Sequence, residues 1–249
     1  MIILTFIYNY LSSTITKHGV EKKMKQSVLI VGAGHGLSAS LAKLCFSRGM
    51  SVNLAARDIT KLKSLQLETS AQLHRCDASE IDQVSHLFTK LDETTGVPDL
   101  VVYNPSARVR GPIANLNAED TLSALKVTCF GAFLVAQQAT KRMEKRGSGS
   151  IFFTGASAGV KGFPNSSVFA MGKFGLRGLA QSLARELHPK NIHIGHFVID
   201  GKISSKTRES IDNSMLDPDE IAKSYLQFHE QHRSSWAWEL ELRPWIENF

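Results

Sequence analysis

A glycine-rich turn near the amino terminus is the clearest ligand-binding signal in this sequence. The segment Gly32–Gly36 follows the β-branched run Ser27–Val31 and precedes an apolar pattern of helical spacing that begins at Leu37. Glycine removes Cβ where the chain turns tightly and where a pyrophosphate must approach the backbone, and the helix start offers free N–H groups and a positive dipole end. This context favours dinucleotide binding over a purely structural turn. We expect the cofactor phosphates to contact Gly32, Gly34, His35, Gly36 and Leu37.

A basic residue follows the next predicted strand, about twenty residues beyond the glycine turn, where dinucleotide-binding folds read the ribose. An acidic residue there would accept the ribose hydroxyls of NAD, but this chain has Ala56 and then Arg57. A guanidinium can bind a 2′-phosphate with two parallel hydrogen bonds, so the sequence favours NADP over NAD. Two alternatives remain open. In the first, Arg57 is only a solvated loop residue and Asp58 is the N-cap of the next helix. In the second, Asp58 is itself the acidic residue that binds the ribose.

Apolar runs of strand length alternate with helical patterns along the chain, and these elements must position the two signals. The predicted strands are Ser27–Val31, Ser51–Ala55, Gln72–Arg75, Leu100–Tyr103, Ser150–Phe153, Ile192–Ile199 and Trp238–Leu242. The predicted helices are Leu37–Phe46, Thr60–Leu67, Ile81–Leu91, Ala118–Arg146, Val168–Leu187 and Pro218–His229, the last with Asp217 as its N-cap. Such alternation implies right-handed crossovers. We predict a single-domain α/β Rossmann fold over residues 27–249, with a doubly wound parallel sheet of about seven strands.

Residues 1–26 are interpreted separately from this domain. The apolar stretch Met1–Leu11 lacks a preceding basic region and a clear small-residue cleavage site, so a signal peptide is not favoured. The segment has two interpretations. In the first, translation starts at Met24 and the preceding residues are not made. In the second, the extension is real and is disordered or packs on a neighbour.

Composition narrows the functional class. The 249 residues are 43% hydrophobic and 21% charged, which supplies a full core and excludes intrinsically disordered, collagen-like and disulfide-scaffold proteins. The formal net charge is +6, half of it within the first 26 residues, too little for a nucleic-acid surface but favourable for an anionic small ligand. Three cysteines without a CxxC pair and nine histidines without ligand spacing predict no metal site and a reducing, cytoplasmic location. The sequence contains no run of 18 apolar residues, so no membrane-spanning helix is predicted.

Taken in order, these motifs resemble the short-chain dehydrogenase/reductase family over about 220 residues from position 27 onward. The glycine turn is similar to the family's TGxxxGxG, with Val31 for the threonine and Ser38 for the last glycine. The resemblance implies that Asp77, after the third strand, contacts the adenine and that Asn104, after the fourth, lies against the adenine ribose. It also implies that the backbone at Ile203, after the sixth strand, holds the nicotinamide amide.

The same resemblance implies an incomplete catalytic set. The family's Tyr-x-x-x-Lys reads here as Phe169 followed by Lys173, which share one helix face at i and i+4. Lys173 can still reach a ribose, whereas Phe169 has no hydroxyl to donate a proton. The family's serine aligns with Ala156, with Ser157 beside it, and its active-site asparagine aligns with Thr128.

Three replacements could supply the missing chemistry. Ser157 could turn its hydroxyl to the substrate, Ser166 or Ser167 could offer one from the helix start, and Lys173 could donate a proton if burial lowers its pKa. Each has a structural alternative. Ser157 is only a small loop residue, Ser166 or Ser167 only caps the helix, and Lys173 only holds the ribose. Asp200 is a pocket acid or a turn former. Lys173 and Ser157 are the catalytic candidates.

Two functions therefore follow. The first is an NADP-dependent oxidoreductase that acts on an unidentified carbonyl or alcohol, and the alternative is a non-catalytic NADPH-binding sensor or scaffold protein. The resemblance also implies a homodimer or homotetramer formed through Ala118–Arg146 and Val168–Leu187. An apolar stripe on the second helix fits that interface, unless it faces the monomer's own sheet: Leu176, Leu179, Ala180 and Leu183. The expected partner is a small-molecule substrate, not a nucleic acid or a membrane.

Overall fold

The computed structural model describes residues 25–205 and 207–247. The interpretation of residues 1–26 as an extension, and of Met24 as a start, falls almost entirely outside the described residues.

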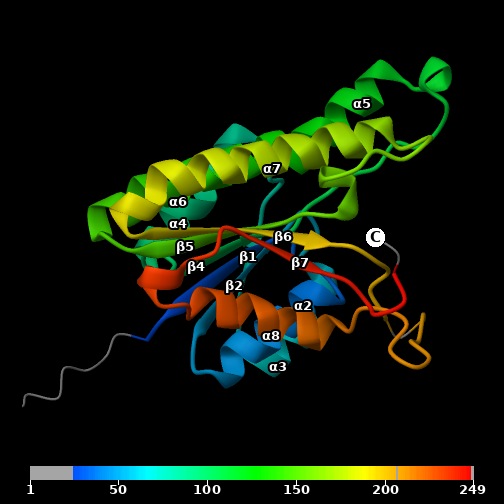
Figure 1. The fold of residues 1–249 in the computed structure, drawn as a ribbon. Coiled ribbons are helices and arrows are strands. Elements are labelled where there is room, and N and C mark those ends of the chain that lie inside the picture. The colour runs from blue at the N-terminus through cyan, green and yellow to red at the C-terminus, as the bar shows by residue number, and fades with distance from the viewer. Residues whose placement is uncertain (1–24, 206, 248–249) are drawn as a thin grey trace, which may run out of the picture.

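A seven-stranded parallel sheet forms the centre of the molecule, in the order β3-β2-β1-β4-β5-β6-β7 (Figure 1). The strands are β1 Ser27–Val31, β2 Ser51–Ala56, β3 Gln72–Arg75, β4 Leu100–Tyr103, β5 Gly149–Thr154, β6 Ile192–Ile199 and β7 Glu239–Leu242. Strand order reverses between β1 and β4, so the chain leaves the sheet in opposite directions there and opens a crevice at the carboxyl edge. This confirms the predicted α/β Rossmann fold, and the predicted strand ends are shifted by at most one residue.

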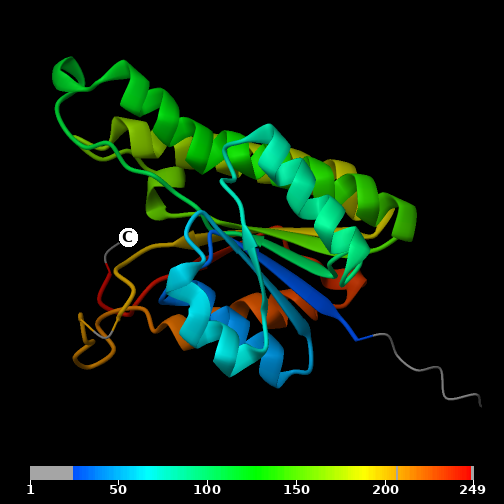
Figure 2. The ribbon, with the colours of Figure 1, turned by 180° about the vertical axis from the view of Figure 1, so that it is seen from behind.

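Helices cover both faces of the sheet, with α4, α6 and α7 on one side and α2, α3 and α8 on the other (Figures 1 and 2). Their bounds are α2 Leu37–Ser47, α3 Lys63–Thr69, α4 Ile81–Glu93, α5 Ala118–Leu125, α6 Gly131–Arg146, α7 Ser167–Leu187 and α8 Pro218–His229. Strand β1 is buried on both faces: Leu29 and Val31 join the core under α4, α6 and α7, while Val28 and Ile30 join the core under α2 and α8. The continuous apolar run of β1 is what a parallel strand between two helical layers requires.

The predicted helix Ala118–Arg146 is helical throughout but has a π turn, Lys126–Phe130, between α5 and α6. The Tyr103 hydroxyl at the end of β4 donates to the Val127 carbonyl at 2.5 Å, which satisfies a backbone group of that turn. A Cβ at Gly131 would clash with the same hydroxyl, so the helix passes the sheet at close range. Among the described residues this run alone is long and apolar enough to cross a membrane, yet 44% of its most apolar window is buried, as in a core helix.

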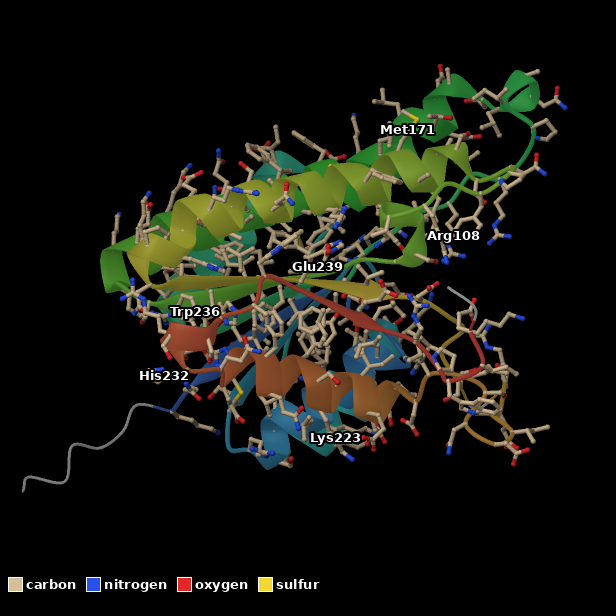
Figure 3. All side chains as sticks on the ribbon, in the orientation of Figure 1. Arg108, Met171, Lys223, His232, Trp236 and Glu239 are labelled. Carbon is tan, nitrogen blue, oxygen red and sulfur yellow. The ribbon has the colours of Figure 1, made fainter. Side chains whose placement is uncertain are left out.

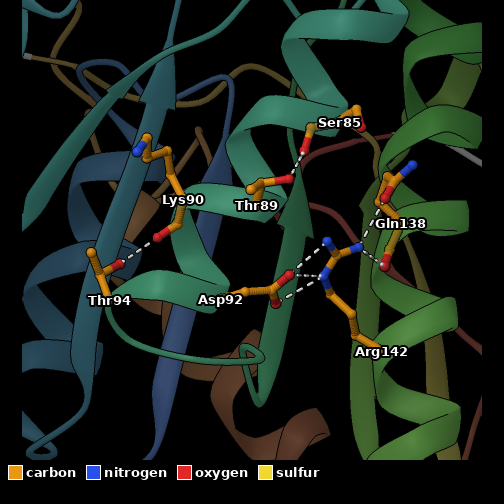
Figure 4. Close-up of polar contacts among 7 residues, drawn as sticks. All are labelled: Ser85, Thr89, Lys90, Asp92, Thr94, Gln138 and Arg142. Carbon is orange, nitrogen blue, oxygen red and sulfur yellow. Dashed lines mark hydrogen bonds and ion pairs between the residues drawn. The ribbon is translucent and has the colours of Figure 1, made fainter.

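An ion pair ties α6 to α4 on the outer surface of this layer (Figure 4). Arg142 donates from Nε and Nη2 to the Asp92 carboxylate at 2.9 and 2.7 Å, and from Nη1 to Gln138 Oε1 at 2.8 Å. The guanidinium fork therefore connects the carboxyl-terminal part of α6 to α4.

Candidate cofactor and substrate site

The glycine turn lies at the carboxyl end of β1 and leaves open space beside its backbone. Gly32 and Gly36 have φ angles of +76° and +89°, a region that residues with a Cβ rarely adopt. A Cβ at Gly32 would lie 2.6 Å from the Pro105 ring, whereas a Cβ at Gly34 or Gly36 would meet nothing within 4 Å. Helix α2 then begins at Leu37 without a side-chain cap. The loop can therefore offer backbone N–H groups to an anion, as its sequence predicts.

A polar bridge connects this loop to the end of β4. Asn104 Nδ2 donates to Ser38 Oγ at 2.8 Å, and the Ser38 hydroxyl lies 3.3 Å from the Gly32 carbonyl, to which it donates. The Asn104 backbone N–H donates to the Val31 carbonyl at 3.0 Å. Asn104 and Ser38 therefore fix the turn from below, and the serine that departs from the family's glycine has a role that sequence reasoning missed. His35 lies exposed at the tip of the loop, while Leu37 is buried beneath it.

Arg57 follows β2 at the same edge of the sheet. The N–H groups of Gly32 and Ala33 donate to the Ala55 carbonyl at 2.9 and 3.0 Å, which brings the residues after β2 beside the glycine turn. The Arg57 side chain is exposed, and no acid in the described part of the chain pairs with it. The cation is therefore available to a ligand at this point.

Asp58 is committed to its own turn. Its Oδ1 accepts from the Thr60 N–H at 3.0 Å and from the Thr60 hydroxyl at 2.5 Å, and these bonds lower the pKa of the carboxyl. The predicted helix Thr60–Leu67 is a 3₁₀ turn, Thr60–Leu62, followed by α3. Ile59, not Asp58, is the N-cap of the 3₁₀ turn, but the Asp58 carboxylate accepts from the first residue of that turn. This occupation favours a structural role for Asp58 over the alternative of a ribose ligand.

Asp77 follows β3 and forms a similar turn before α4. Its Oδ1 accepts from the Ser79 N–H at 3.0 Å and from the Ser79 hydroxyl at 2.7 Å. The backbone N–H of Asp77 donates to Gln83 Oε1 at 2.8 Å, so the residue is held in place after β3, at the carboxyl edge of the sheet.

Lys173 lies on α7 and points under the carboxyl end of β5. Its side chain is 2% exposed, and Nζ donates to the Thr154 carbonyl at 2.6 Å. Burial, and secondarily the charge of Arg108, lowers the pKa of this ammonium from its usual 10.5 to about 7. No carboxylate among the described residues pairs with it, so it can hold or release a proton near neutral pH.

The turn of α7 after Lys173 is bound to the edge strand. Arg177 donates from Nε and Nη2 to the Glu239 carboxylate at 2.7 and 2.8 Å, and His196 Nδ1 lies 2.9 Å from the same carboxylate. Glu239 lies midway along the sheet in Figure 3. The network fixes the rotation of α7 and therefore the direction of Lys173.

Phe169 lies one turn before Lys173 on the same face of α7, as its spacing predicts. Its ring forms a small buried cluster with Ala156 and Ala158, and Lys173 Nζ is 5.8 Å from the ring centroid. The guanidinium carbon of Arg108 lies over the same ring at 4.1 Å. The Phe169 ring therefore contacts apolar side chains, and its centroid lies within 5.8 Å of two cationic groups.

Thr128 occupies the π turn and is buried against α7. A Cβ at Gly172 would lie 2.9 Å from Thr128 Cβ, so glycine allows the two helices to approach. Thr128 Oγ1 accepts from the Ala107 N–H at 3.0 Å. The threonine therefore holds the loop after β4.

The serine candidates differ in their surroundings. Ser157 is half-buried, its carbonyl accepts from Val160 and Lys161, and its hydroxyl has no partner among the described side chains. Ser166 stands at the N-cap of α7 without a side-chain cap bond, and the Ser167 hydroxyl is buried without a partner in the described part of the chain. Ser166 therefore occupies the N-cap position that the capping alternative predicts, but neither hydroxyl makes a capping hydrogen bond.

The segment after β6 leaves the same carboxyl edge of the sheet. Asp200 is 3% exposed, with Lys161 Nζ at 3.4 Å and Arg243 Nη2 at 3.6 Å from its carboxylate. Ile203 is half-buried and forms a bridge with Leu216. Asp200 is neutralised by two cations that sequence reasoning did not single out.

Arg108 is a further residue that sequence reasoning missed. The only signal for it is a basic pair, Arg108 and Arg110, a few residues after Asn104. Among the described residues no group of three or more histidine, cysteine, aspartate or glutamate side chains could hold a metal ion.

Comparison with known proteins places these features in one family. The family model described as short chain dehydrogenase matches residues 26–215. Sepiapterin reductase of Chlorobaculum tepidum is 28% identical over 237 residues, 89% of this chain and 97% of that protein. A short-chain dehydrogenase from Rhodopseudomonas palustris superimposes with a TM-score of 0.78 at 31% identity, covering 88% of this chain and 99% of the other. A metagenomic short-chain oxidoreductase solved in complex with NADP superimposes with a TM-score of 0.79 at 24% identity. The match covers 90% of this chain and 99% of the other.

Proposed function

We propose that this chain, which belongs to the short-chain dehydrogenase family, is an NADP(H)-dependent oxidoreductase that interconverts a carbonyl compound and its alcohol. The observation that carries this proposal is the meeting of two features at one edge of the sheet. An open glycine turn leads into the uncapped start of α2, and a buried Lys173 with a pKa of about 7 lies across the crevice. The first suits a dinucleotide and the second suits proton transfer to or from a reacting oxygen.

The cofactor site follows the order of the strands. Gly32, Gly34, His35, Gly36 and Leu37 hold the pyrophosphate in this proposal. Arg57 binds the 2′-phosphate, Asp77 and Asn104 lie along the adenosine, and the Ile203 backbone holds the nicotinamide amide. The free guanidinium of Arg57 and the commitment of Asp58 to Thr60 support NADP over NAD. The metagenomic oxidoreductase that binds NADP supports the same choice.

Lys173 is the proton donor in this proposal, because Phe169 has no hydroxyl. NADPH supplies the hydride when bound. The Lys173 ammonium gives its proton to the developing alkoxide, and Ser157 donates a hydrogen bond to the same oxygen. A positioned general acid contributes roughly 10²- to 10⁴-fold in rate. The lowered pKa of Lys173 suits this task, because an ordinary ammonium of pKa 10.5 is a much weaker acid at neutral pH.

One observation favours the alternative function, a non-catalytic NADPH-binding sensor or scaffold. Phe169 packs with Ala156 and Ala158 in an apolar cluster at the place where the family resemblance expects hydroxyl groups. A cofactor would bind there without an acid beside it unless Lys173 acts.

NADPH oxidation against a panel of aldehydes and ketones separates the two functions. We expect slow wild-type turnover that Lys173→Ala abolishes, together with weaker NADPH binding in fluorescence titration. Lys141→Ala, on the exposed side of α6, is the matched control. NADPH binding without turnover of any carbonyl, followed by gain of turnover in the triple variant Phe169→Tyr, Ala156→Ser, Thr128→Asn, would establish the alternative.

We also propose a homodimer or homotetramer, through a face that includes only part of the predicted stripe. Leu176 and Ala180 are fully buried in the monomer's own core, whereas Leu179 lines the same surface hollow as Phe130 and Met171. Large apolar side chains instead remain exposed across the π turn, α6 and α7, where Figure 3 shows Met171: Phe130, Phe133, Met171 and Phe174. Their exposed fractions of 39 to 54% form a face that a second copy would cover. The free thiols of Cys45, Cys76 and Cys129 fit a cytoplasmic location.

A further inference from the structure

Arg108 brings a second cation into the substrate side of the crevice. It lies in the loop after β4, at the end of the molecule toward which the strands point (Figure 3). Its guanidinium carbon is 4.1 Å from the centroid of the Phe169 ring, and Lys173 Nζ is 5.8 Å from the same centroid. The Phe169 ring thus supports a guanidinium beside the group that we propose as proton donor.

No acid balances this charge within the described residues. Arg108 forms no ion pair or hydrogen bond there, and Lys173 donates only to a neutral carbonyl. Loss of solvation and the charge of Arg110 both lower the pKa of Arg108, and the charge of Arg108 lowers that of Lys173, so the cations repel one another. Asp200, the buried acid of this edge, already faces Lys161 and Arg243.

The loop that carries Arg108 is anchored. The N–H of the preceding residue, Ala107, donates to Thr128 Oγ1 at 3.0 Å, and Thr128 is 1% exposed within the π turn. Arg108 is exposed to solvent, the Thr128 contact anchors the backbone beside it, and its guanidinium lies over the Phe169 ring. Cations kept together without a counterion raise the local concentration of an anion and favour its binding.

From this geometry we infer that Arg108 is a specificity-determining residue, and that the carbonyl substrate bears an anionic oxygen group, a carboxylate or a phosphate, close to its carbonyl. The inference rests on the proposed oxidoreductase function. The planar guanidinium presents parallel N–H donors that match both groups. Binding the anion at Arg108 would direct the neighbouring carbonyl toward Lys173, because both cations flank the Phe169 ring.

Matched substrate pairs test the inference with the full-length protein. The pairs are a 2-oxo acid and its methyl ester, a 3-oxo acid and its methyl ester, and a hydroxyketone phosphate and the free hydroxyketone. The enzymes are the wild type, Arg108→Gln, Arg108→Lys and the control Arg185→Gln, which lies about three turns beyond Lys173 on α7. The two acids and the phosphate ester separate the carboxylate from the phosphate.

We expect the wild type to prefer one anionic member of a pair by at least about tenfold in kcat/KM. Arg108→Gln should lower kcat/KM for that anion by about 10- to 100-fold, the size of a lost hydrogen bond to a charged group, and for its neutral partner by less than about threefold. Arg108→Lys should retain part of the preference, and Arg185→Gln should match the wild type. An equal loss for charged and neutral members, or a wild-type preference for the neutral ones, would overturn the inference.

A binding measurement keeps the test decisive if no carbonyl is reduced, an outcome that would refute the proposed function alone. Calorimetry of the NADPH complex with lactate, 3-hydroxybutyrate and inorganic phosphate then reports on the anion site directly. Binding to the wild type that is lost in Arg108→Gln, with NADPH affinity unchanged, supports the inference. Binding of none of these anions, or a loss of NADPH affinity in Arg108→Gln, overturns it, because Arg108 would then bind no anion or would serve the cofactor.

Discussion

Replacing Lys173 by methionine should stabilise the protein at acidic and neutral pH while removing its activity. The side chain is 2% exposed and has no acidic partner among the described residues, so the folded state carries an ammonium at a site that disfavours charge. Methionine has similar length and no charge. It fills the same space and removes that penalty.

The magnitude follows from the pKa change. A pKa lowered from 10.5 to about 7 corresponds to about 5 kcal/mol of preference for the neutral form, at 1.36 kcal/mol for each pH unit. Methionine also leaves the Thr154 carbonyl without its donor, which costs about 1–3 kcal/mol. Lys173→Met should therefore raise the free energy of unfolding by about 2–4 kcal/mol at pH 6.

The stability difference between Lys173→Met and the wild type should depend on pH in a defined direction. Between about pH 7 and pH 10.5 the unfolded wild type binds a proton that the folded wild type has released, so wild-type stability rises with pH in this window. The advantage of Lys173→Met should therefore be largest below pH 7 and should fall to zero between about pH 8 and pH 10. Above that point the variant should be the less stable protein by up to about 1–3 kcal/mol, because only the lost bond to the Thr154 carbonyl remains. Urea unfolding of both proteins without cofactor, from pH 6 to pH 10, measures the difference. A difference that stays constant with pH would refute a lowered pKa for Lys173.

Three further outcomes test other parts of the site. The rate of carbonyl reduction should fall as pH rises through about 7, because Lys173 must be protonated to act as the acid; a flat profile of NADPH oxidation from pH 6 to pH 9 would exclude it. Arg57→Ala should remove most of a preference for NADPH over NADH that we expect to be at least about tenfold, or roughly 1.4 kcal/mol, in fluorescence titration, and equal wild-type affinities would contradict the assignment. Gly32→Ala should lower the free energy of unfolding in urea by about 1–3 kcal/mol, because its Cβ would lie 2.6 Å from Pro105 at a φ of +76°, whereas Gly34→Ala should change it little.

The fold was predictable because its signals are local. The run Ile192–Ile199 is buried at every position and reads in the sequence as a strand between two helical layers. The glycine turn was predictable for the same reason, since the strand, the turn and the helix start adjoin in the chain. The π turn was not, because it depends on Thr128 reaching the loop after β4 and on Tyr103 reaching Val127, contacts between segments that are distant in sequence.

Thr128 and Phe169, which the family resemblance aligns with an asparagine and a tyrosine, each make contacts of their own. Thr128 holds the Ala107 backbone, and Phe169 lies beneath Arg108. Reverting one of these residues alone would therefore disturb a contact that the present neighbours require. Thr128 and Phe169 therefore both contact the segment that carries Arg108. These contacts support a catalytic site adapted to a charged substrate over a site that has lost its catalytic activity.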